Sequence, residues 1–351
     1  MSFTSARSSA TRSMVALGAV MVLVAVVAAA VGSGAGAAPR AKKSVTIALF
    51  VAIQSNPVEQ AIINNFQAIA KKDGAAKFVV FDSNNSVQKE IANCNDAIAA
   101  NKYDAFALKA VAGPPLMGCA RAALKAGIPV VAFGNTLGPN PNTEKRQVPG
   151  LSGSVIELAR INGAAVANLV NQACRAKKAT PCNVIYTYGP LAFDWASISR
   201  KYFTQTAKAK YPNIKIVTTG LYNFDPNQAR TLLKSLLQTH TDVDVIASDG
   251  DLGAIGAIQA LKDVGKTAGK DIYVTGGAIS KQGAGLIRSG QMFGSTCLMP
   301  ATEARVSAKL AIQAARGEKI AKPDVEVCAA FARTGNNPIT KANLAKFTPE
   351  W

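Results

Sequence analysis

The chain has 351 residues, of which 49% are hydrophobic and 17% are charged. This composition excludes a disordered chain and a single small module, because it supplies enough apolar surface for two compact lobes. The formal net charge is +18, but no basic run alternates with aromatic residues as single-strand binders require, so we expect no nucleic-acid partner.

The first 38 residues have the layout of a secretory signal. Residues 2–13 are polar and include Arg7 and Arg12, and an uninterrupted run of apolar and small residues extends from Met14 to Val31. Small residues at 35–38 offer cleavage sites, so we predict export to the periplasm or cell envelope. Because the apolar run approaches the length of a membrane span, an uncleaved anchor is the alternative.

A buried strand followed by a capped helix opens the folded part of the chain. Residues 45–51 are β-branched and aromatic, which is typical of a strand in a parallel sheet. Asn56 is the predicted N-cap of the helix, Pro57 its first residue and Glu59 the partner that closes a capping box. Because ligands of open α/β sheets bind beyond the carboxyl ends of the strands, Gln54, Asn56 and Glu59 are predicted ligand contacts.

Strand and helix patterns then alternate up to residue 134. The expected strands lie at 77–82, 104–110 and 128–134, and the expected helices at 86–101 and 114–126. Such alternation predicts a doubly wound parallel sheet with right-handed crossovers. The following stretch, 135–151, is rich in Pro, Asn and Gly and is the predicted crossing to a second lobe.

The second half of the chain repeats this plan. An Ala-rich helix is expected at 154–174, and strands at 183–189, 214–220, 243–249 and 272–277. The predicted fold is therefore α/β, with two doubly wound parallel-sheet lobes joined by a three-segment hinge. We expect the first lobe to comprise residues 45–147 and 300–325, and the second lobe residues 148–299 and 326–351.

The six cysteines are Cys94, Cys119, Cys174, Cys182, Cys297 and Cys328. In an exported chain they predict disulfides, although the sequence alone allows fifteen connectivities. Cys174 and Cys182 flank a short loop and are the first expected pair. Cys297 and Cys328 lie in β-like runs that could be neighbours, which leaves Cys94 with Cys119, although Cys94 also fits a buried thiol on a helix. With one histidine and no CxxC motif, neither a metal nor a cofactor is expected.

Six stretches carry a resemblance to a known family: SNPVEQ from Ser55, FDSNNSVQKEIANCNDAIA from Phe81, AALKAGIPVVAFGN from Ala122, FDPNQA from Phe224, SDGDLGAIGAIQALKDVGK from Ser248 and GLIRSGQMFGSTCLMP from Gly285. In this order and spacing the chain resembles the sugar-type (type I) periplasmic solute-binding proteins of ABC importers. The resemblance implies a clamshell that closes on one small solute and presents it to a membrane permease. It implies a monomer. The residues themselves predict no enzymatic activity, because the chain has one histidine and no recognisable triad or metal spacing.

The resemblance also points to an unusual ligand. Where relatives commonly hold sugar hydroxyls with aromatic or charged side chains, this chain has Val58, Gly134, Ala278 and Leu298. Because an unpaired buried polar group costs about 1–3 kcal/mol, these residues favour a less hydroxylated or cationic ligand. The predicted ligand contacts are Gln54, Asn56, Glu59, Asn135, Trp195, Phe224, Asp249 and Asp251.

Several alternatives remain at this stage. Trp195 could lie in the core, and Asp251 could cap the helix that begins at Leu252. The protein could also be a sensing module for a membrane signalling partner, or a secreted hydrolase that uses Glu59 with Asp249 or Asp251. A hydrolase would show turnover, whereas the other two functions require stoichiometric binding.

Overall fold

The computed structural model describes residues 42–335 and 337–351. The predicted signal or anchor at residues 1–38 lies outside the described residues. Within the described ranges, no helix combines the length and the apolar character that a bilayer crossing requires.

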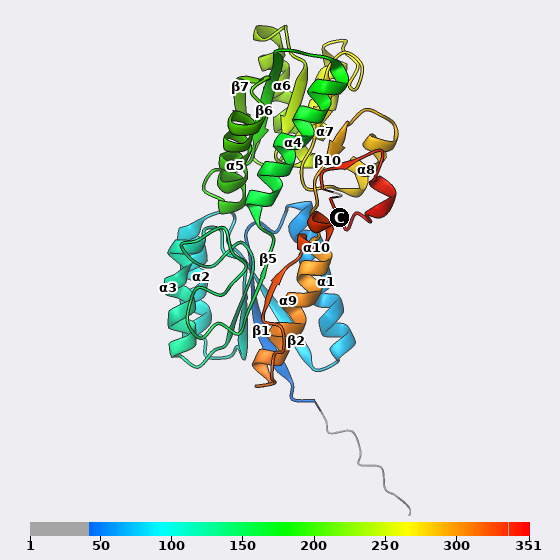
Figure 1. Cartoon of the computed structure of the whole chain (residues 1–351). Helices are drawn as coiled ribbons and strands as arrows, with labels where there is room; N and C mark the ends of the chain where they lie inside the picture. Colours follow the sequence, from blue (N-terminus) through cyan, green and yellow to red (C-terminus); the bar gives the residue numbers. More distant parts are fainter. Residues whose placement is uncertain (1–41, 336) are drawn as a thin grey trace, which may run out of the picture. The chain divides into compact units, whose positions relative to one another are not determined.

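The first lobe, which contains the labels β1, β2, α2 and α3 in Figure 1, is built on a six-stranded sheet in the order β11-β5-β4-β3-β1-β2. All its strands pair in parallel: β1 (Val45–Val51), β2 (Ala76–Asp82), β3 (Ala105–Leu108), β4 (Val130–Gly134), β5 (Gly153–Ile156) and β11 (Asp324–Glu326). Helices α1 (Pro57–Asp73) and α9 (Pro300–Ala315) cover one face, and α2 (Val87–Ala99) and α3 (Gly113–Lys125) cover the other.

Strand β1 shows why both faces are covered. Ile47 and Leu49 pack in the cluster formed with α1 and α9, whereas Ala48 and Phe50 pack in the cluster formed with α2 and α3. Successive side chains of a strand point to opposite faces, so a continuous apolar run needs a helical layer on each side.

The second lobe has its own six-stranded sheet in the order β12-β10-β9-β8-β6-β7. Its strands are β6 (Cys182–Tyr188), β7 (Ile214–Leu221), β8 (Val245–Ser248), β9 (Tyr273–Thr275), β10 (Gly294–Ser295) and the antiparallel edge strand β12 (Ile339–Thr340). Helices α4 (Ala159–Lys177) and α5 (Asp194–Lys210) pack on one face. Helices α6 (Pro226–Thr239), α7 (Asp251–Asp263) and α8 (Lys281–Arg288) pack on the other. A short helix α10 (Ala329–Arg333) and a 3-10 turn (Leu344–Lys346) complete the chain.

This architecture confirms the predicted fold class, with one correction at the first crossing. The helix expected at 154–174 begins only at Ala159, because residues 153–156 form strand β5 of the first sheet. The expected lobe boundary at residue 148 therefore falls too early. The sequence could not show this, because a short run of buried small and apolar residues has no periodicity that distinguishes a strand from the first turn of a helix.

The chain passes between the two sheets after β5, after β10 and after β11. The disulfide between Cys297 and Cys328 joins the second of these connections to the third. This pairing is the expected one, but the two cysteines do not lie in neighbouring strands, because Cys297 follows β10 and Cys328 immediately precedes α10. The other pairings, Cys94 with Cys119 and Cys174 with Cys182, are present as expected.

The disulfide between Cys297 and Cys328 should stabilise the chain more than the pair at 174 and 182. It closes a sequence separation of 31 residues, against 8 for the other pair. Constraint of the unfolded chain grows with the closed loop, so replacing both Cys297 and Cys328 by serine should lower the free energy of unfolding by about 3–4 kcal/mol, against about 2–3 for the short loop. Urea unfolding of the two double variants measures this, and an equal or larger loss for the short loop would contradict it.

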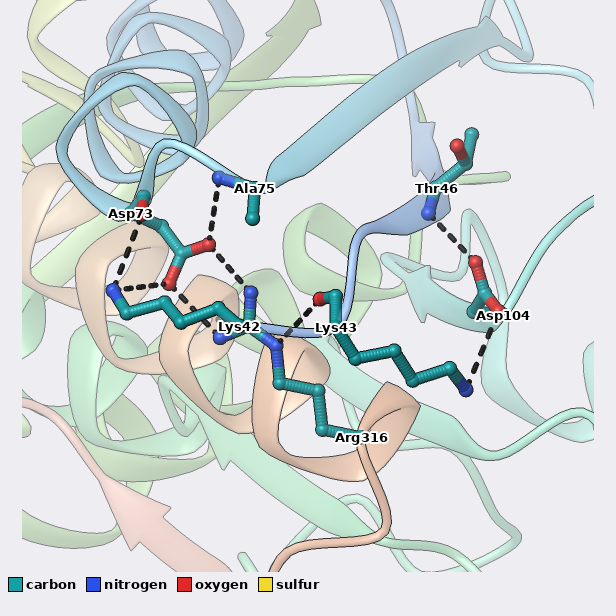
Figure 2. Close-up of polar contacts among 7 residues, drawn as sticks. All are labelled: Lys42, Lys43, Thr46, Asp73, Ala75, Asp104 and Arg316. Atoms are coloured by element: carbon teal, nitrogen blue, oxygen red, sulfur yellow. Dashed lines mark hydrogen bonds and ion pairs between the residues drawn. The ribbon is translucent and has the colours of Figure 1, made fainter. Parts of the chain in front are cut away.

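A polar cluster ties the start of the described chain to two helix ends (Figure 2). Asp73 at the end of α1 accepts two hydrogen bonds from Arg316, at 2.6 and 2.9 Å, and one from Lys42 at 3.1 Å. Arg316 follows α9 directly and also donates to the carbonyl oxygen of Lys43 at 3.0 Å. The cluster therefore holds α1, α9 and the segment that enters β1 together.

Replacing Asp73 by asparagine should destabilise the protein mainly at neutral pH. The Arg316 hydrogen bond, helped by Lys42, holds the pKa of Asp73 well below its usual range. A carboxylate with a lowered pKa in the folded state adds stability above its unfolded pKa and loses it as the pH falls. We therefore expect a loss of about 1.5–3 kcal/mol near pH 7 and a smaller loss near pH 3. Urea unfolding at both values tests this, with Asp96→Asn on the exposed side of α2 as the control.

Candidate functional site

A cavity of about 80 Å³ is lined by residues of both lobes. This is several times the space that one buried water needs. From the first lobe, Asn56, Lys109 and Asn135 line it, each a few residues beyond the end of β1, β3 or β4. From the second lobe, Trp195 and Phe224 line it, beyond the ends of β6 and β7. The cavity therefore lies beyond the carboxyl ends of both parallel sheets, where the fold places ligands.

Lys109 is the centre of a buried charged group in the first-lobe wall. It follows β3 directly, and its ammonium lies 2.5 Å from Oε1 of Glu59, with both side chains less than a tenth exposed. Glu157, which follows β5, and Glu303, in the first turn of α9, are also buried and line the same cavity. We call Lys109, Glu59, Glu157 and Glu303 the Lys109 cluster.

The Lys109 cluster contains three acidic side chains and one cationic side chain, and this imbalance shifts the pKa values of its members. Burial lowers the pKa of Lys109, but the charges of Glu59, Glu303 and Glu157 outweigh this effect and raise it overall, so the side chain stays cationic. Burial raises the pKa of Glu303 to about 7, and Lys109 offsets the rise only in part. Burial, together with the charges of Glu303 and Glu326, raises the pKa of Glu157 well above its ordinary value.

Several buried polar atoms around the cavity lack a hydrogen-bond partner within the described part of the chain. On the first-lobe side these are Oε2 of Glu59, Oε2 of Glu157 and Oε1 of Glu303. The indole Nε1 atoms of Trp195 and Trp351, which also line the cavity, are the others. Buried polar groups in native proteins are nearly always paired, so these carboxyl oxygens and indole N–H groups are the wall atoms that can bond to a molecule inside the cavity.

The second lobe contributes an aromatic wall. The ring of Phe224 lies 6.3 Å from that of Trp195, 6.0 Å from that of Phe193 and 5.8 Å from that of Tyr222, measured between centroids. Phe224 has a φ of 54°, in the left-handed region, one residue before the Asp225 cap of α6. A Cβ on Gly189 would lie 2.2 Å from the Phe224 ring, so glycine is required there for the close approach.

Most of the predicted contact residues lie along this cavity: Asn56, Glu59, Asn135, Trp195, Phe224 and Asp251. Trp195 also packs against the buried cluster of Ala52, Val111 and Phe193, so it combines the two placements considered for it, in the core and at the cavity. Val58, Gly134, Ala278 and Leu298, which were expected to replace the sugar-gripping residues of relatives, also line it. Whether these residues contact a solute stays a prediction.

Two predicted contacts are placed elsewhere. Gln54 is exposed in the turn after β1 and does not line the cavity. Asp249 is fully buried, and its carboxylate accepts hydrogen bonds from the Tyr222 hydroxyl at 2.8 Å and the Gly189 amide at 2.9 Å. Asp249 thus supports the loop that carries the aromatic wall, because a carboxylate buried this deeply must be paired inside the protein.

Asp251 and Glu59 differ from expectation in their bonding. Asp251 is the first residue of α7 and not its cap, which is Gly250, and its carboxylate accepts from Ser280 and Ser295. Glu59 does not close a capping box, because it pairs with Lys109 instead, although Asn56 caps α1 as predicted. The acids of the hydrolase alternative therefore all have partners inside the protein: Glu59 pairs with Lys109, and Asp249 and Asp251 accept hydrogen bonds within the second lobe.

Sequence reasoning missed several cavity residues, and four of them are important for the site: Lys109, Glu157, Glu303 and Trp351. Two of them carried a local signal, because Lys109 and Glu157 are charged residues directly after buried strands. Glu303 and Trp351 carried none, since helix α9 and the end of the sequence reach the cavity only through the tertiary fold.

Comparisons with known proteins agree with this geometry. A family model described as a periplasmic binding protein domain matches residues 47–319. The ribose import binding protein of Bacillus subtilis (strain 168) is 22% identical over 281 residues, which cover 80% of this chain and 85% of the relative. The xylitol-binding protein of Mycolicibacterium smegmatis is 26% identical over 153 residues, 43% of this chain and 42% of the relative.

Solved structures share the fold. An ABC transporter solute-binding protein from Bacillus halodurans C-125 with bound myo-inositol has a TM-score of 0.73 at 17% identity and covers 89% of this chain and 100% of its own. The Caulobacter myo-inositol-binding protein has a TM-score of 0.72 at 22% identity, covering 89% and 98%. At these identities the likeness establishes the architecture alone.

Proposed function

Because the chain belongs to the periplasmic binding protein family, we propose that it is exported and serves as the solute-binding subunit of an ABC importer. The family membership confirms the resemblance stated from the sequence. Relatives named for ribose import match most of the chain, which supports a role in import. In this role the protein binds one solute per chain and presents it to a membrane permease without chemical change.

The proposed movement is closure of the two lobes over the solute. Three connections join the sheets, and the cavity takes its walls from both lobes. A solute that contacts both walls binds the closed arrangement better than an open one, and it shifts the population by that difference in affinity. The permease can then recognise the loaded form by its closure.

The proposed solute is small and cationic, such as an amine or an amino-substituted polyol. The observation that carries this proposal is the Lys109 cluster, in which three carboxyl groups surround one ammonium and each has an unpartnered oxygen. A second positive charge brought by the solute would pair with the carboxylates that Lys109 leaves unbalanced. The opposite wall of Trp195, Phe193 and Phe224 offers ring faces that attract a cation.

The relatives show what a competing solute would be. The structures with bound myo-inositol hold an uncharged polyol, whose hydroxyls both donate and accept. Such a molecule would also satisfy carboxylate oxygens and indole N–H groups. It would leave the excess of acids uncompensated, which is why we favour the amine.

Matched pairs of solutes test the proposal. We would titrate the chain without residues 1–38 with glucose and glucosamine, and with myo-inositol and its monoamino analogue, by calorimetry and thermal shift. We expect the amine of each pair to bind at least tenfold tighter, which corresponds to about 1.4 kcal/mol. Tighter binding of the uncharged member of both pairs would overturn the cationic assignment and keep the family role. Absence of binding by every sugar, polyol and amine would count against the import role itself.

A further inference from the structure

Residues 350 and 351 lie across the boundary between the lobes. The carboxylate of Glu350 accepts hydrogen bonds from the Thr302 amide at 2.8 Å and from the Thr302 hydroxyl at 2.5 Å, and Arg305 donates to it at 3.3 Å. Thr302 and Arg305 belong to α9, which packs on the first sheet. The carbonyl oxygen of Trp351 accepts from the Lys281 amide at 2.8 Å, and Lys281 begins α8 on the second sheet. Glu350 is thus bonded to the first lobe and Trp351 to the second.

Both attachments use helix N-termini, where the backbone offers donors. The first amides of a helix have no partner inside the helix, and the helix dipole favours a negative group there. Thr302 lies in the first turn of α9, and Lys281 is the first residue of α8. The carboxylate of Glu350 and the carbonyl of Trp351 therefore satisfy amides that would otherwise need water.

Trp351 lies at the cavity that the two lobes share. It lines the cavity together with Trp195, and the chain has two tryptophans in all. Its Nε1 is buried and has no hydrogen-bond partner among residues 42–335 and 337–351. A buried indole N–H without a partner points to an acceptor that is supplied from inside the cavity.

We infer that Glu350 and Trp351 form a strap, which holds the two lobes against each other and makes the indole of Trp351 a wall of the solute cavity. The strap adds a non-covalent link to the three covalent connections between the sheets. Opening of the lobes must break the Glu350 bonds to α9 or the Trp351 bond to α8. This inference extends the proposed function, and it can be tested without any solute.

The two tryptophans make the strap directly measurable. In a Trp195→Phe variant, Trp351 is the remaining source of indole fluorescence. We expect acrylamide to quench this emission severalfold less than it quenches N-acetyltryptophanamide, because the ring is packed into the cavity. Adding Glu350→Ala should raise the quenching constant severalfold, since the bonds to Thr302 and Arg305 are lost. Glu318→Ala, at an exposed position after α9, is the matched control and should change nothing.

Amide hydrogen exchange provides a second readout on the same variants. The Lys281 amide should exchange slowly in the parent and faster in the Glu350→Ala variant, because release of the strap exposes it. Should Glu350→Ala fail to fold, Thr302→Val removes the hydroxyl donor from α9 and weakens the same contact. The inference would be overturned if acrylamide quenched Trp351 in the Trp195→Phe variant as strongly as it quenches N-acetyltryptophanamide. It would also be overturned if neither the quenching constant nor the exchange rate of the Lys281 amide changed in the strap variants. Neither result would bear on whether glucosamine or myo-inositol binds, so the two proposals can fail separately.

Discussion

Replacing Lys109 by methionine is expected to lower the free energy of unfolding by about 3–5 kcal/mol, because it leaves the buried carboxylate of Glu59 without its partner. The Glu59 side chain is 4% exposed and that of Lys109 is 8% exposed, so the pair is shielded from bulk solvent. The same substitution removes the positive charge of Lys109, which lowers the pKa of both Glu157 and Glu303. Urea unfolding near pH 7 measures the loss, and Lys89→Met on the exposed side of α2 is the control.

The double variant Lys109→Met with Glu59→Leu shows whether the loss of stability in Lys109→Met comes from the unpaired charge of Glu59 or from lost packing of the Lys109 side chain. Replacing both partners removes the unpaired charge, so we expect the double variant to regain most of the stability lost in Lys109→Met. Additive losses would show that each residue acts alone, and the argument for a coupled pair would then be wrong. The stable double variant also allows binding to be measured without the central cation.

The position of Lys109 illustrates how far the sequence could predict this site. The strand and helix patterns before residue 134 were sufficient to predict the sheet, because β1, β3 and β4 are buried apolar runs and helix α1 has a recognisable cap at Asn56. The same patterns predicted that residues after β1 and β4 line the cavity. They did not indicate that Glu59 would leave the capping box, since its partner Lys109 follows β3 and is 50 residues away in the sequence.

The second lobe shows the complementary difficulty. Asp249 and Asp251 both follow a strand end, which is where ligand contacts are expected. The structure gives both carboxylates donors inside the lobe, from Tyr222, Gly189, Ser280 and Ser295. An acid used for structural bonding and an acid free to bind a solute have the same local sequence pattern. The distinction depends on donors that are distant in the chain and were not predictable.

The predicted start of α4 was too early for a similar reason, because contacts distant in the sequence decide the local structure. Strand β5 is stabilised by pairing with β4 on one side and with β11 on the other, and β11 lies far along the chain. Tertiary pairing therefore decides the conformation of residues 153–156, which local propensity leaves open. The placement of β5 in turn positions Glu157 at the cavity.

Affinity for a cationic solute is expected to rise with pH because of Glu303. The carboxyl group has a pKa of about 7, raised by burial and by the charges of Glu59 and Glu350 and lowered in part by Lys109. A cation prefers the ionised form, so the affinity for glucosamine should increase about 10–30-fold between about pH 5.5 and 7.5. The free energy of unfolding of the solute-free protein should instead decrease as the pH rises. A carboxyl whose pKa is higher in the folded state loses stability as the pH rises from its unfolded pKa toward 7.

Calorimetry in two buffers of different ionisation enthalpy tests the proton linkage directly. Binding of glucosamine near pH 6.5 should release protons in the parent chain and release fewer in a Glu303→Gln variant, whose affinity should vary little with pH. Glu318→Gln, an exposed change on the segment after α9, should behave as the parent does. A pH-independent affinity in the parent would mean that Glu303 does not face the solute. If the affinity of the Glu303→Gln variant still depended steeply on pH, Glu157 would be the titrating group, because its pKa is also raised and it lines the same wall.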